Sequence, residues 1–362
     1  MATIDVITTI ERFYALKPVW DNLYSRNRHN RVFQSFDWNM VVWEGFHMKR
    51  MPDESLFIIY AKQEGSRPRE VILPCSIDKR GCLRLIGHGM TDVLSEISPP
   101  HTDNWHDFYL QIVRFLQANS LIKSILFFNL EDTSELLRYF GVYWKDAVIL
   151  KCDAISFFQA KQSENIAEAI PHLLSTERSN IKRLAKKWQE YDFVIYSKKE
   201  GREYPLSQLT ALRRWMIEHR LRVSAAIPVE YIAVMNRLYD MHKCEISCLV
   251  DKRDGSFVYA AYRLLGCENV VFWVIFYKDC SMTACGDARY ILEKMKYAPL
   301  IFDFGTGVYP YKLSNFLPQV QFLYSVSVHP MTAVNLVLDL YWLIRRYLKV
   351  FLVFLSLVKP RR

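Results

Sequence analysis

The chain has 362 residues, of which 51% are hydrophobic and 23% charged, so it is a folded protein of about two globular units and not a disordered one. Its 47 Lys and Arg against 38 Asp and Glu leave a formal net charge of +9, which favours an anionic partner such as nucleic acid, a phosphorylated cofactor or an acidic membrane surface. The surplus does not form a dense basic tail, so charge alone does not select among these partners. Residues 1–20 contain Asp5 and Glu11 and no apolar stretch of signal-peptide length, and we therefore expect a cytoplasmic protein.

The first half of the sequence alternates helical and extended patterns. We expect helices over 11–26 and 36–47, the second capped by Ser35, and then strands over 56–61, 70–77 and 82–87. A loop at Pro99-Pro100 is followed by a helix over 105–117, a strand over 124–130, a helix over 133–140 and a strand over 148–155.

The second half repeats this succession. A helical stretch over 163–190, with a break near Pro171, leads to a strand over 193–197, helices over 206–220 and 228–242, and strands over 245–251, 256–266 and 269–278. Asp254-Gly255 predicts a tight hairpin turn. A helix over 286–297 and strands over 300–305 and 320–328 follow. The common order predicts an α+β fold of two similar domains, 1–158 and 159–330, each with a mixed, mostly antiparallel sheet flanked by helices.

The C-terminal segment 331–362 is apolar and basic. Its last charge-free run, 350–358, is shorter than the roughly 20 residues that span a bilayer. We expect an amphipathic helix that lies on an acidic membrane surface or docks on its own domain; the two alternatives are equally supported.

Several polar clusters match no strong catalytic or metal-binding pattern. His101, Asp103, His106 and Asp107 have no ligand spacing, and Cys248 near His242 and Cys244 lies in an apolar strand, so no metal site is expected. The chain contains no GxSxG, HExxH or Walker loop, which removes the best-marked hydrolases and NTPases. The eight cysteines show no CxxC and are expected to be free thiols.

A basic run precedes the strand expected at 193–197. Between Arg178 and Lys187 there are five basic residues and no acid: Arg178, Lys182, Arg183, Lys186 and Lys187. Like charges at i,i+4 repel slightly unless an anion lies between them. The run is either a solvated helix face or a docking surface for the phosphates of a cofactor or tRNA, to which Arg178 and Arg183 would contribute.

A strand-to-helix junction follows at YKDCSMTACGD, residues 277–287. Lys278 ends the strand, and we expect the next helix to begin near Asp287, directly after Cys285-Gly286. A glycine at a helix start lets backbone N–H groups approach an anion, and the helix dipole helps. These four residues are therefore candidates for cofactor binding.

The stretch IFDFGTGVYPYKLSNF, residues 301–316, completes a recognisable order of basic helix, strand, two helices, three antiparallel strands and helix. This order resembles the acetyltransferase domain of CelD-like (cellulose biosynthesis type) proteins, a branch of the GNAT superfamily. It is more distantly similar to the Fem-type aminoacyltransferases, which pair two GNAT-like domains. SFDWNMVVWEGF and LRLIGHGMTDVLSEI resemble the N-terminal segments of the family, including an acid after a glycine turn, here Asp92. The usual Ser-Pro-Gly step and phosphate-loop glycines are replaced by Thr283-Ala284-Cys285-Gly286, so only Gly286 carries over.

The resemblance implies acyl transfer from acyl-CoA, as a co-substrate and not a tightly bound cofactor, to a small-molecule or saccharide acceptor. It implies Asp303 as base, Tyr311 as proton donor and Lys312 as a stabiliser of negative charge. Asp92, Gly305, Gly307 and Phe316 would contact substrate, with the glycines allowing a close backbone approach or a positive φ. The alternative is a structural turn closed by an Asp–Lys ion pair.

Two other functions stay open at this point. A Fem-type transferase would use aminoacyl-tRNA, but no long helical arm for tRNA is evident in the sequence. A catalytically inactive scaffold at the membrane would keep the fold and explain the missing phosphate-loop glycines. No DNA partner is expected.

Overall fold

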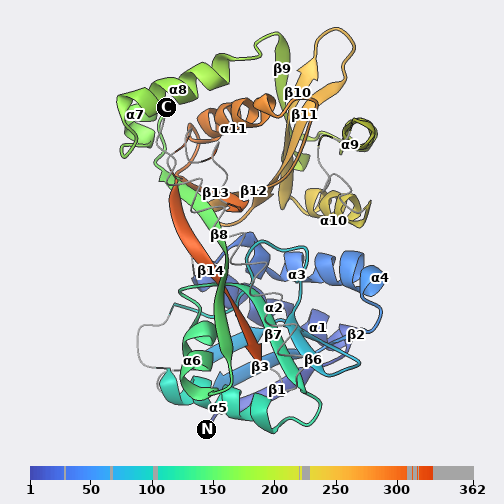
Figure 1. The fold of residues 1–362 in the computed structure, drawn as a ribbon, viewed down its shortest axis with the longest axis vertical. Helices are drawn as coiled ribbons and strands as arrows, with labels where there is room; N and C mark the ends of the chain where they lie inside the picture. Colours follow the sequence, from blue (N-terminus) through green and yellow to red (C-terminus); the bar gives the residue numbers. More distant parts are fainter. Residues whose placement is uncertain are drawn as a thin grey trace. The chain divides into compact units, whose positions relative to one another are not determined.

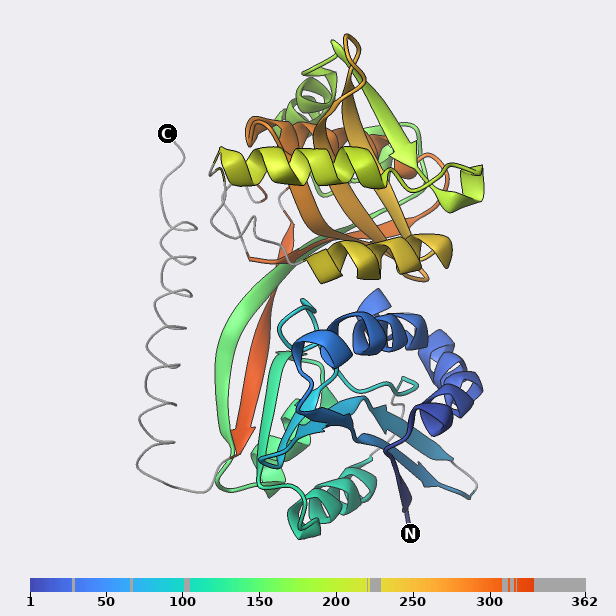
Figure 2. The ribbon, with the colours of Figure 1, turned by 90° about the vertical axis from the view of Figure 1, so that its right-hand side faces the viewer.

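The computed structural model describes residues 1–27, 30–65, 68–100, 105–219, 221, 229–307, 312, 316 and 318–328. The chain forms two compact units, drawn in Figures 1 and 2. Unit 1 is Met1–Ala154 together with the chain from Gln321 on, and unit 2 is Ile155–Val320. Strand β8 (Val148–Ala160) begins in unit 1 and ends in unit 2.

Unit 1 contains two sheets. The first is antiparallel, in the order β1-β3-β4: β1 (Thr3–Ile7), β3 (Ile58–Gln63) and β4 (Arg69–Leu73). The second runs β2-β5-β6-β7-β14-β8: β2 (Glu54–Leu56), β5 (Cys75–Asp78), β6 (Cys82–Leu85), β7 (Ser124–Glu131) and β14 (Gln319–Val328) with β8. The run expected at 70–77 is split into β4 and β5 because Pro74 has no N–H for a strand ladder.

The helices of unit 1 are α1 (Ile10–Ala15), α2 (Lys17–Arg26), the 3₁₀ turn η1 (Val32–Gln34), α3 (Phe36–Val42), the π-helical η2 (Trp43–His47), α4 (Met48–Arg50), α5 (His106–Ala118) and α6 (Glu135–Tyr143). Ser35 caps α3 as predicted, with its side chain accepting the backbone N–H of Trp38. The buried face of α5, including Phe108 and Ile112, packs with Phe127 of β7 in one hydrophobic core.

Unit 2 is a single sheet with helices on both faces. Its order is β8-β13-β12-β11-β10-β9: β9 (Tyr191–Tyr196), β10 (Cys244–Asp251), β11 (Phe257–Leu265), β12 (Asn269–Tyr277) and β13 (Leu300–Thr306) with β8. Helices α9 (Leu206–Glu218) and α10 (Val229–Asp240) cover one face, and α11 (Ser281–Lys294), packed on α8 (Ser175–Lys186), covers the other (Figure 1). The short elements α7 (Ile166–Ala169) and η3 (Lys198–Glu200) flank α8 and β9.

Among the strands that the structure describes, each unit has a parallel pair beside antiparallel neighbours. These pairs are β6 with β7 in unit 1 and β12 with β13 in unit 2. Parallel neighbours need a crossover connection, which α5 and α11 provide. The repeated succession predicted from the sequence is therefore confirmed, and β7 and β13 hold equivalent places in the two units.

Three findings concern the limits of the predicted elements. The helix expected over 163–190 is two helices and ends at Lys186; Trp188, just beyond, has a positive φ of 63°. The last residues of β14, expected in the second domain, pair with β7 and so lie in the sheet of unit 1. The segment 331–362, with its expected amphipathic helix, lies outside the described residues.

Two further expectations can be compared with the described residues. All eight cysteines are free thiols. Among the helices of the described part of the chain, none is both long and apolar enough to cross a membrane.

Candidate active site

The parallel strands β12 and β13 separate part-way along their length. They pair through Asn269–Ile301, Val270–Phe302 and Val271–Asp303, after which β12 continues to Tyr277 and β13 to Thr306. In the part of the chain that the structure describes, no strand pairs with this edge of β12 beyond Val271. Every second N–H and C=O of a strand points away from one neighbour, so this stretch presents backbone donors and acceptors beside Asp303.

Asp303 is the last residue of β13 that pairs with β12, and its carboxylate accepts a hydrogen bond from the turn that follows. The side chain is fully buried, and Oδ1 accepts the backbone N–H of Gly305 at 2.8 Å. Gly305 and Gly307 have φ values of 67° and 82°, in the left-handed region that favours glycine. The positive φ expected at both glycines is thus confirmed, and the turn places a buried carboxylate at the end of the sheet.

Lys312 closes the same turn from the other side. Its side chain is buried, and Nζ donates to the carbonyl oxygens of Phe304 (2.5 Å), Gly307 (3.0 Å) and Thr306 (3.4 Å). An ammonium has three N–H donors. These contacts hold the turn together and account for the burial of the charge. Tyr311, the expected proton donor, lies outside the described residues.

Phe316, expected to contact substrate, is fully buried in this structure. Its ring stacks on Phe304 with 5.1 Å between centroids, and Phe304 in turn lies 5.0 Å from Phe272 of β12. These rings fill the space between β12, β13 and the residues that follow. They stiffen the strand end at which Asp303 and its turn are placed.

The helix expected to begin near Gly286 begins five residues earlier, at Ser281, so this prediction is wrong. Gly286 lies inside α11, where a Cβ would come within 2.3 Å of the Tyr259 ring. A close helix–sheet contact therefore requires glycine at this position. Cys285 is also buried, and burial raises the pKa of its thiol.

Asp287, a third residue expected near the cofactor, belongs to a buried ion pair. Its Oδ1 lies 2.7 Å from Nη2 of Arg263, and both side chains are almost fully buried. Tyr259 donates to the same carboxylate oxygen, and the guanidinium lies over the ring of Phe272 at 3.9 Å. The pair ties α11 to the sheet beneath it. The sequence shows no local signal for this pairing.

The carboxylate of Asp279 lies at the start of α11. Oδ1 of Asp279 accepts the backbone N–H of Ser281 at 2.8 Å. The N-terminus of a helix attracts anions because its N–H groups and dipole are positive there. Asp279 therefore supplies an anionic oxygen to one backbone N–H at this helix start. The pattern Asp-x-Ser, typical of a turn leading into a helix, was the sequence signal for this start.

Lys278 lines a pocket of about 510 Å³ between α9 and the β10–β11 turn. Its Nζ donates to Oγ of Ser256 at 3.3 Å and lies 6.0 Å from the centre of the Trp215 ring. Phe257 and Leu212 add apolar walls. A cation beside an aromatic wall suits a ligand that has both an apolar part and a negative charge.

The basic run lies on α8. Lys182, Arg183, Lys186 and Lys187 are exposed, whereas Arg178 is half-buried. None of the five forms an ion pair with another described residue. Helix α8 packs on α11, and Arg289 of α11 donates to the carbonyl of Ala185 at 2.8 Å. The exposed face of α8 is thus an uncompensated positive surface beside α11.

Asp92, expected to contact substrate, lies half-buried in the loop after β6. It therefore belongs to unit 1, whereas Asp303 belongs to unit 2.

Unit 1 also holds a cluster that the sequence did not reveal. In it, Glu54 lies 2.9 Å from His47 Nδ1 and 2.8 Å from His88 Nε2. His47 Nε2 accepts the N–H of Gly87, so the proton of the neutral ring is on Nδ1, which faces Glu54 and has no lone pair for a metal. Arg84 also contacts Glu54, at 3.2 Å. The cluster is a hydrogen-bonded network and poorly suited to a cation.

The fold of the described residues is that of a tandem GNAT-like protein. No protein-family model matches the chain, and no curated protein matches it in sequence. Among solved structures, FemX matches with a TM-score of 0.55 and 9% identity, over 90% of this chain and 96% of FemX. A tandem GNAT protein from the clavulanic acid biosynthesis pathway matches with a TM-score of 0.51 and 10% identity, over 92% and 100%. A conserved protein of unknown function from Bacteroides thetaiotaomicron matches with a TM-score of 0.52 and 8% identity, over 90% and 100%. At these identities the likeness establishes the fold alone.

Proposed function

We propose that the chain is an acyltransferase whose transfer site lies in unit 2, where β12 and β13 part. The observation that carries this proposal is the pairing that stops at Val271–Asp303 while both strands continue, leaving a backbone edge beside a buried carboxylate. The fold shared with a tandem GNAT protein supports it. An extended donor arm with amide groups would bind along this edge as an added strand.

The reaction requires a nucleophile, a base and donors for the oxyanion. An amine or hydroxyl of the acceptor attacks the acyl carbonyl, passes its proton to the carboxylate of Asp303, and expels the donor's thiolate or alkoxide, which takes up a proton. In this proposal, backbone N–H groups of β12 beyond Val271 stabilise the tetrahedral oxyanion. Lys312 holds the turn that places Asp303, and Tyr311 is proposed as the proton donor to the leaving group.

We propose acyl-CoA, with an acetyl group in the first instance, as the donor. Because Asp279 occupies the start of α11, the phosphates of the donor would lie instead on the basic face of α8 or at Lys278. The resemblance to CelD-like proteins suggests a sugar or polysaccharide precursor as the acceptor, with Asp92 as a further contact. A cytoplasmic position, with residues 331–362 on an acidic membrane surface, completes the proposal.

One observation favours a second candidate, a Fem-type transferase that takes its acyl group from aminoacyl-tRNA. A carboxylate at the start of α11 opposes a pyrophosphate there, whereas the unpaired cations of α8 suit the phosphates of an RNA. The fold similarity to FemX is compatible with this donor.

The experiment is a direct comparison of donors with the full-length protein. Titration calorimetry with acetyl-CoA and filter binding with aminoacyl-tRNA are carried out at two salt concentrations, together with an Arg183→Gln, Lys187→Gln variant. Acetyl-CoA binding at or below millimolar concentration supports the first candidate. Salt-sensitive tRNA binding that the double variant weakens supports the second. If neither donor binds, the chain is not an acyltransferase of either kind, and an inactive scaffold is the better account.

A further inference from the structure

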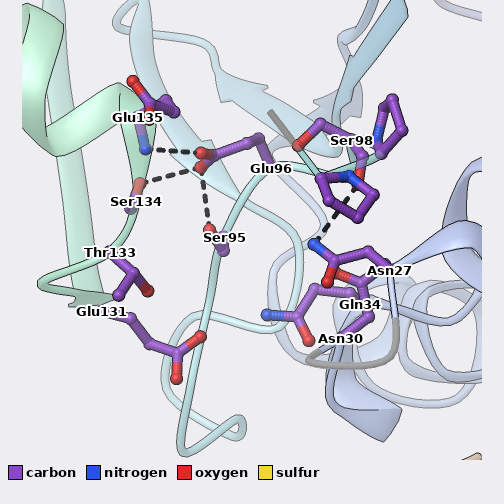
Figure 3. Close-up of a pocket in the computed structure, with 12 residues that line it drawn as sticks. Asn27, Asn30, Gln34, Ser95, Glu96, Ser98, Glu131, Thr133, Ser134 and Glu135 are labelled. Atoms are coloured by element: carbon purple, nitrogen blue, oxygen red, sulfur yellow. Dashed lines mark hydrogen bonds between the residues drawn. The ribbon is translucent and has the colours of Figure 1, made fainter. Parts of the chain in front are cut away.

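Unit 1 contains a small polar pocket at the place that corresponds to the Asp303 turn of unit 2. Strand β7 ends at Glu131, and the pocket is formed by the residues that follow, by the loop after β6 and by the end of α2 and η1 (Figure 3). Its volume is about 220 Å³, below the 300–1,000 Å³ of pockets for drug-sized ligands. At about 30 Å³ for each water in the liquid, it has room for about seven waters.

The carboxylate of Glu96 in this pocket already accepts hydrogen bonds from the protein. Glu96 accepts hydrogen bonds from Ser95 Oγ, Ser134 Oγ and the backbone N–H of Glu135, each at 2.8 Å (Figure 3). The last of these donors belongs to the first turn of α6, whose dipole also favours a negative charge. The pocket therefore offers oxygen acceptors without the bare negative charge that would select a cation.

The carboxylate of Glu131 also has a partner within the protein, the guanidinium of Arg31. Its Oε1 accepts Nε–H of Arg31 at 2.9 Å, and both side chains are largely buried. With Glu96 and Glu131 both paired, a cationic ligand would gain little attraction and would still lose its hydration. An anionic ligand would meet the oxygens of three lining glutamates: Glu96, Glu131 and Glu135.

Gln34 supplies a side-chain donor that has no acceptor among the described residues. The side chain is 3% exposed, and Oε1 accepts the backbone N–H of Arg31 at 2.7 Å, which fixes the orientation of the amide. Its Nε2 has no partner among the described residues, although Gln34 lines the pocket. Gln34 Nε2 is not among the fully buried side-chain atoms, so the N–H₂ is open to the pocket and can donate to an oxygen of a ligand.

We propose that this pocket binds a neutral, hydroxyl-rich ligand of the size of one saccharide ring. Hydroxyl groups both donate and accept, which matches the Gln34 N–H₂ on one side and the glutamate oxygens and Thr133 on the other. Pro99 and Pro100 provide an apolar wall for the C–H face of a ring. The proposal is independent of the acyl transfer assigned to unit 2.

Saturation-transfer NMR and titration calorimetry with the full-length protein test it, with N-acetylglucosamine, glucose and glucosamine as probes. N-acetylglucosamine and glucosamine share the ring but differ in charge at neutral pH. The expected result is millimolar binding of the neutral sugars, insensitive to salt, and weaker binding of glucosamine. Absence of neutral-sugar binding, or preference for the charged glucosamine, would overturn the proposal.

Two variants of pocket residues and one control test whether the sugar binds in this pocket. Gln34→Glu keeps an oxygen for the N–H of Arg31 but replaces the free donor, and should weaken sugar binding at least tenfold. Thr133→Val, at an exposed position, should weaken it two- to fivefold without risk to the fold. Gln117→Glu, the same change on an exposed side chain of α5, should have no effect. Sugar binding that survives both Gln34→Glu and Thr133→Val, with circular dichroism unchanged, would place the ligand elsewhere and refute the assignment.

Discussion

The carboxylate of Asp279 accepts the backbone N–H of Ser281 at 2.8 Å, at the first residue of α11. This contact gives the helix start an anion from within the chain. The negative charge of Asp279 opposes the binding of cofactor phosphates at that helix end. Any phosphate-bearing donor must either compete with Asp279 or bind at another positive surface.

Replacing Asp279 by Asn keeps a hydrogen-bond acceptor for Ser281 but removes the charge. We expect the affinity for CoA to rise about two- to fivefold, since a charge at a helix N-terminus is worth about 0.3–1 kcal/mol. Calorimetry with CoA measures this. Asp53→Asn, which removes an exposed carboxylate of unit 1, is the control and should leave the affinity unchanged. Equal affinities in wild type and Asp279→Asn would mean that the donor does not approach the start of α11.

The order of elements was predictable because it rests on local periodicity. Alternating and helical apolar patterns placed β10, β11 and β12, and Asp254-Gly255 placed the turn between the first two. The family resemblance had also implied that Gly305 and Gly307 allow a close backbone approach or a positive φ, and both have a positive φ. The start of α11 was missed because Gly286 was taken as a helix boundary, whereas it is required by the ring of Tyr259, a contact between residues far apart in the chain.

The same reason explains what was missed at the candidate site. The pairing of Arg263 with Asp287 and that of His47 with Glu54 join residues whose own segments carry no signal for each other. Lys312 was expected near a developing charge, but its contacts with three backbone carbonyls depend on the turn that β13 makes. Sequence patterns located the strand end; only the fold supplied the partners.

Asp303 can be tested with two substitutions that separate chemistry from structure. Asp303→Asn keeps an oxygen for the N–H of Gly305 but is no base, and we expect the acyl-transfer rate to fall about 10²–10⁴-fold with little change in melting temperature. Asp303→Ala also loses the turn contact and should in addition destabilise unit 2 by about 1–3 kcal/mol. Thiol release from acetyl-CoA and thermal unfolding give the two readouts. An Asp303→Asn protein with wild-type activity would restrict Asp303 to the turn.

Gly286 provides a test of the packing between α11 and the sheet. In Gly286→Ala the new Cβ would overlap the Tyr259 ring, and we expect a loss of about 1–3 kcal/mol, as for other overpacked cores. Gly141→Ala in α6 is the matched control: the nearest atom is the flexible end of Ile149 at 3.1 Å, and helix propensity favours Ala. Urea unfolding measures both. Equal stabilities of the two variants would show that α11 is not packed as described.

The stability of unit 1 should decrease in acid because of the His47–Glu54–His88 network. Burial lowers the pKa of His47, so the unfolded chain binds a proton below about pH 6.5 that the folded chain does not. Burial would raise the pKa of Glu54, but hydrogen bonds from His47 and His88 outweigh it and hold that pKa well below the usual range. Both groups therefore make unfolding easier as pH falls, His47 from about pH 6.5 and Glu54 below about pH 4.5.

The measurement is the melting temperature between pH 7.5 and pH 5. We expect a steady fall in the wild type, with a limit of about 1.4 kcal/mol per pH unit for one group. His47→Gln should be less stable at pH 7.5 and show a flatter dependence. His219→Gln, at an exposed position, should keep the wild-type slope. A wild-type slope in the His47→Gln protein would remove His47 from the explanation.

The central claim, that the acyl donor binds along β12 where β13 has left it, is tested most directly by hydrogen exchange. Mass spectrometry of the full-length protein, with and without saturating acetyl-CoA or aminoacyl-tRNA, reports the amides of 272–277 and 303–307. The account predicts that one of the two donors slows exchange in both segments. Donor binding that leaves both segments unprotected, with protection elsewhere, would contradict it.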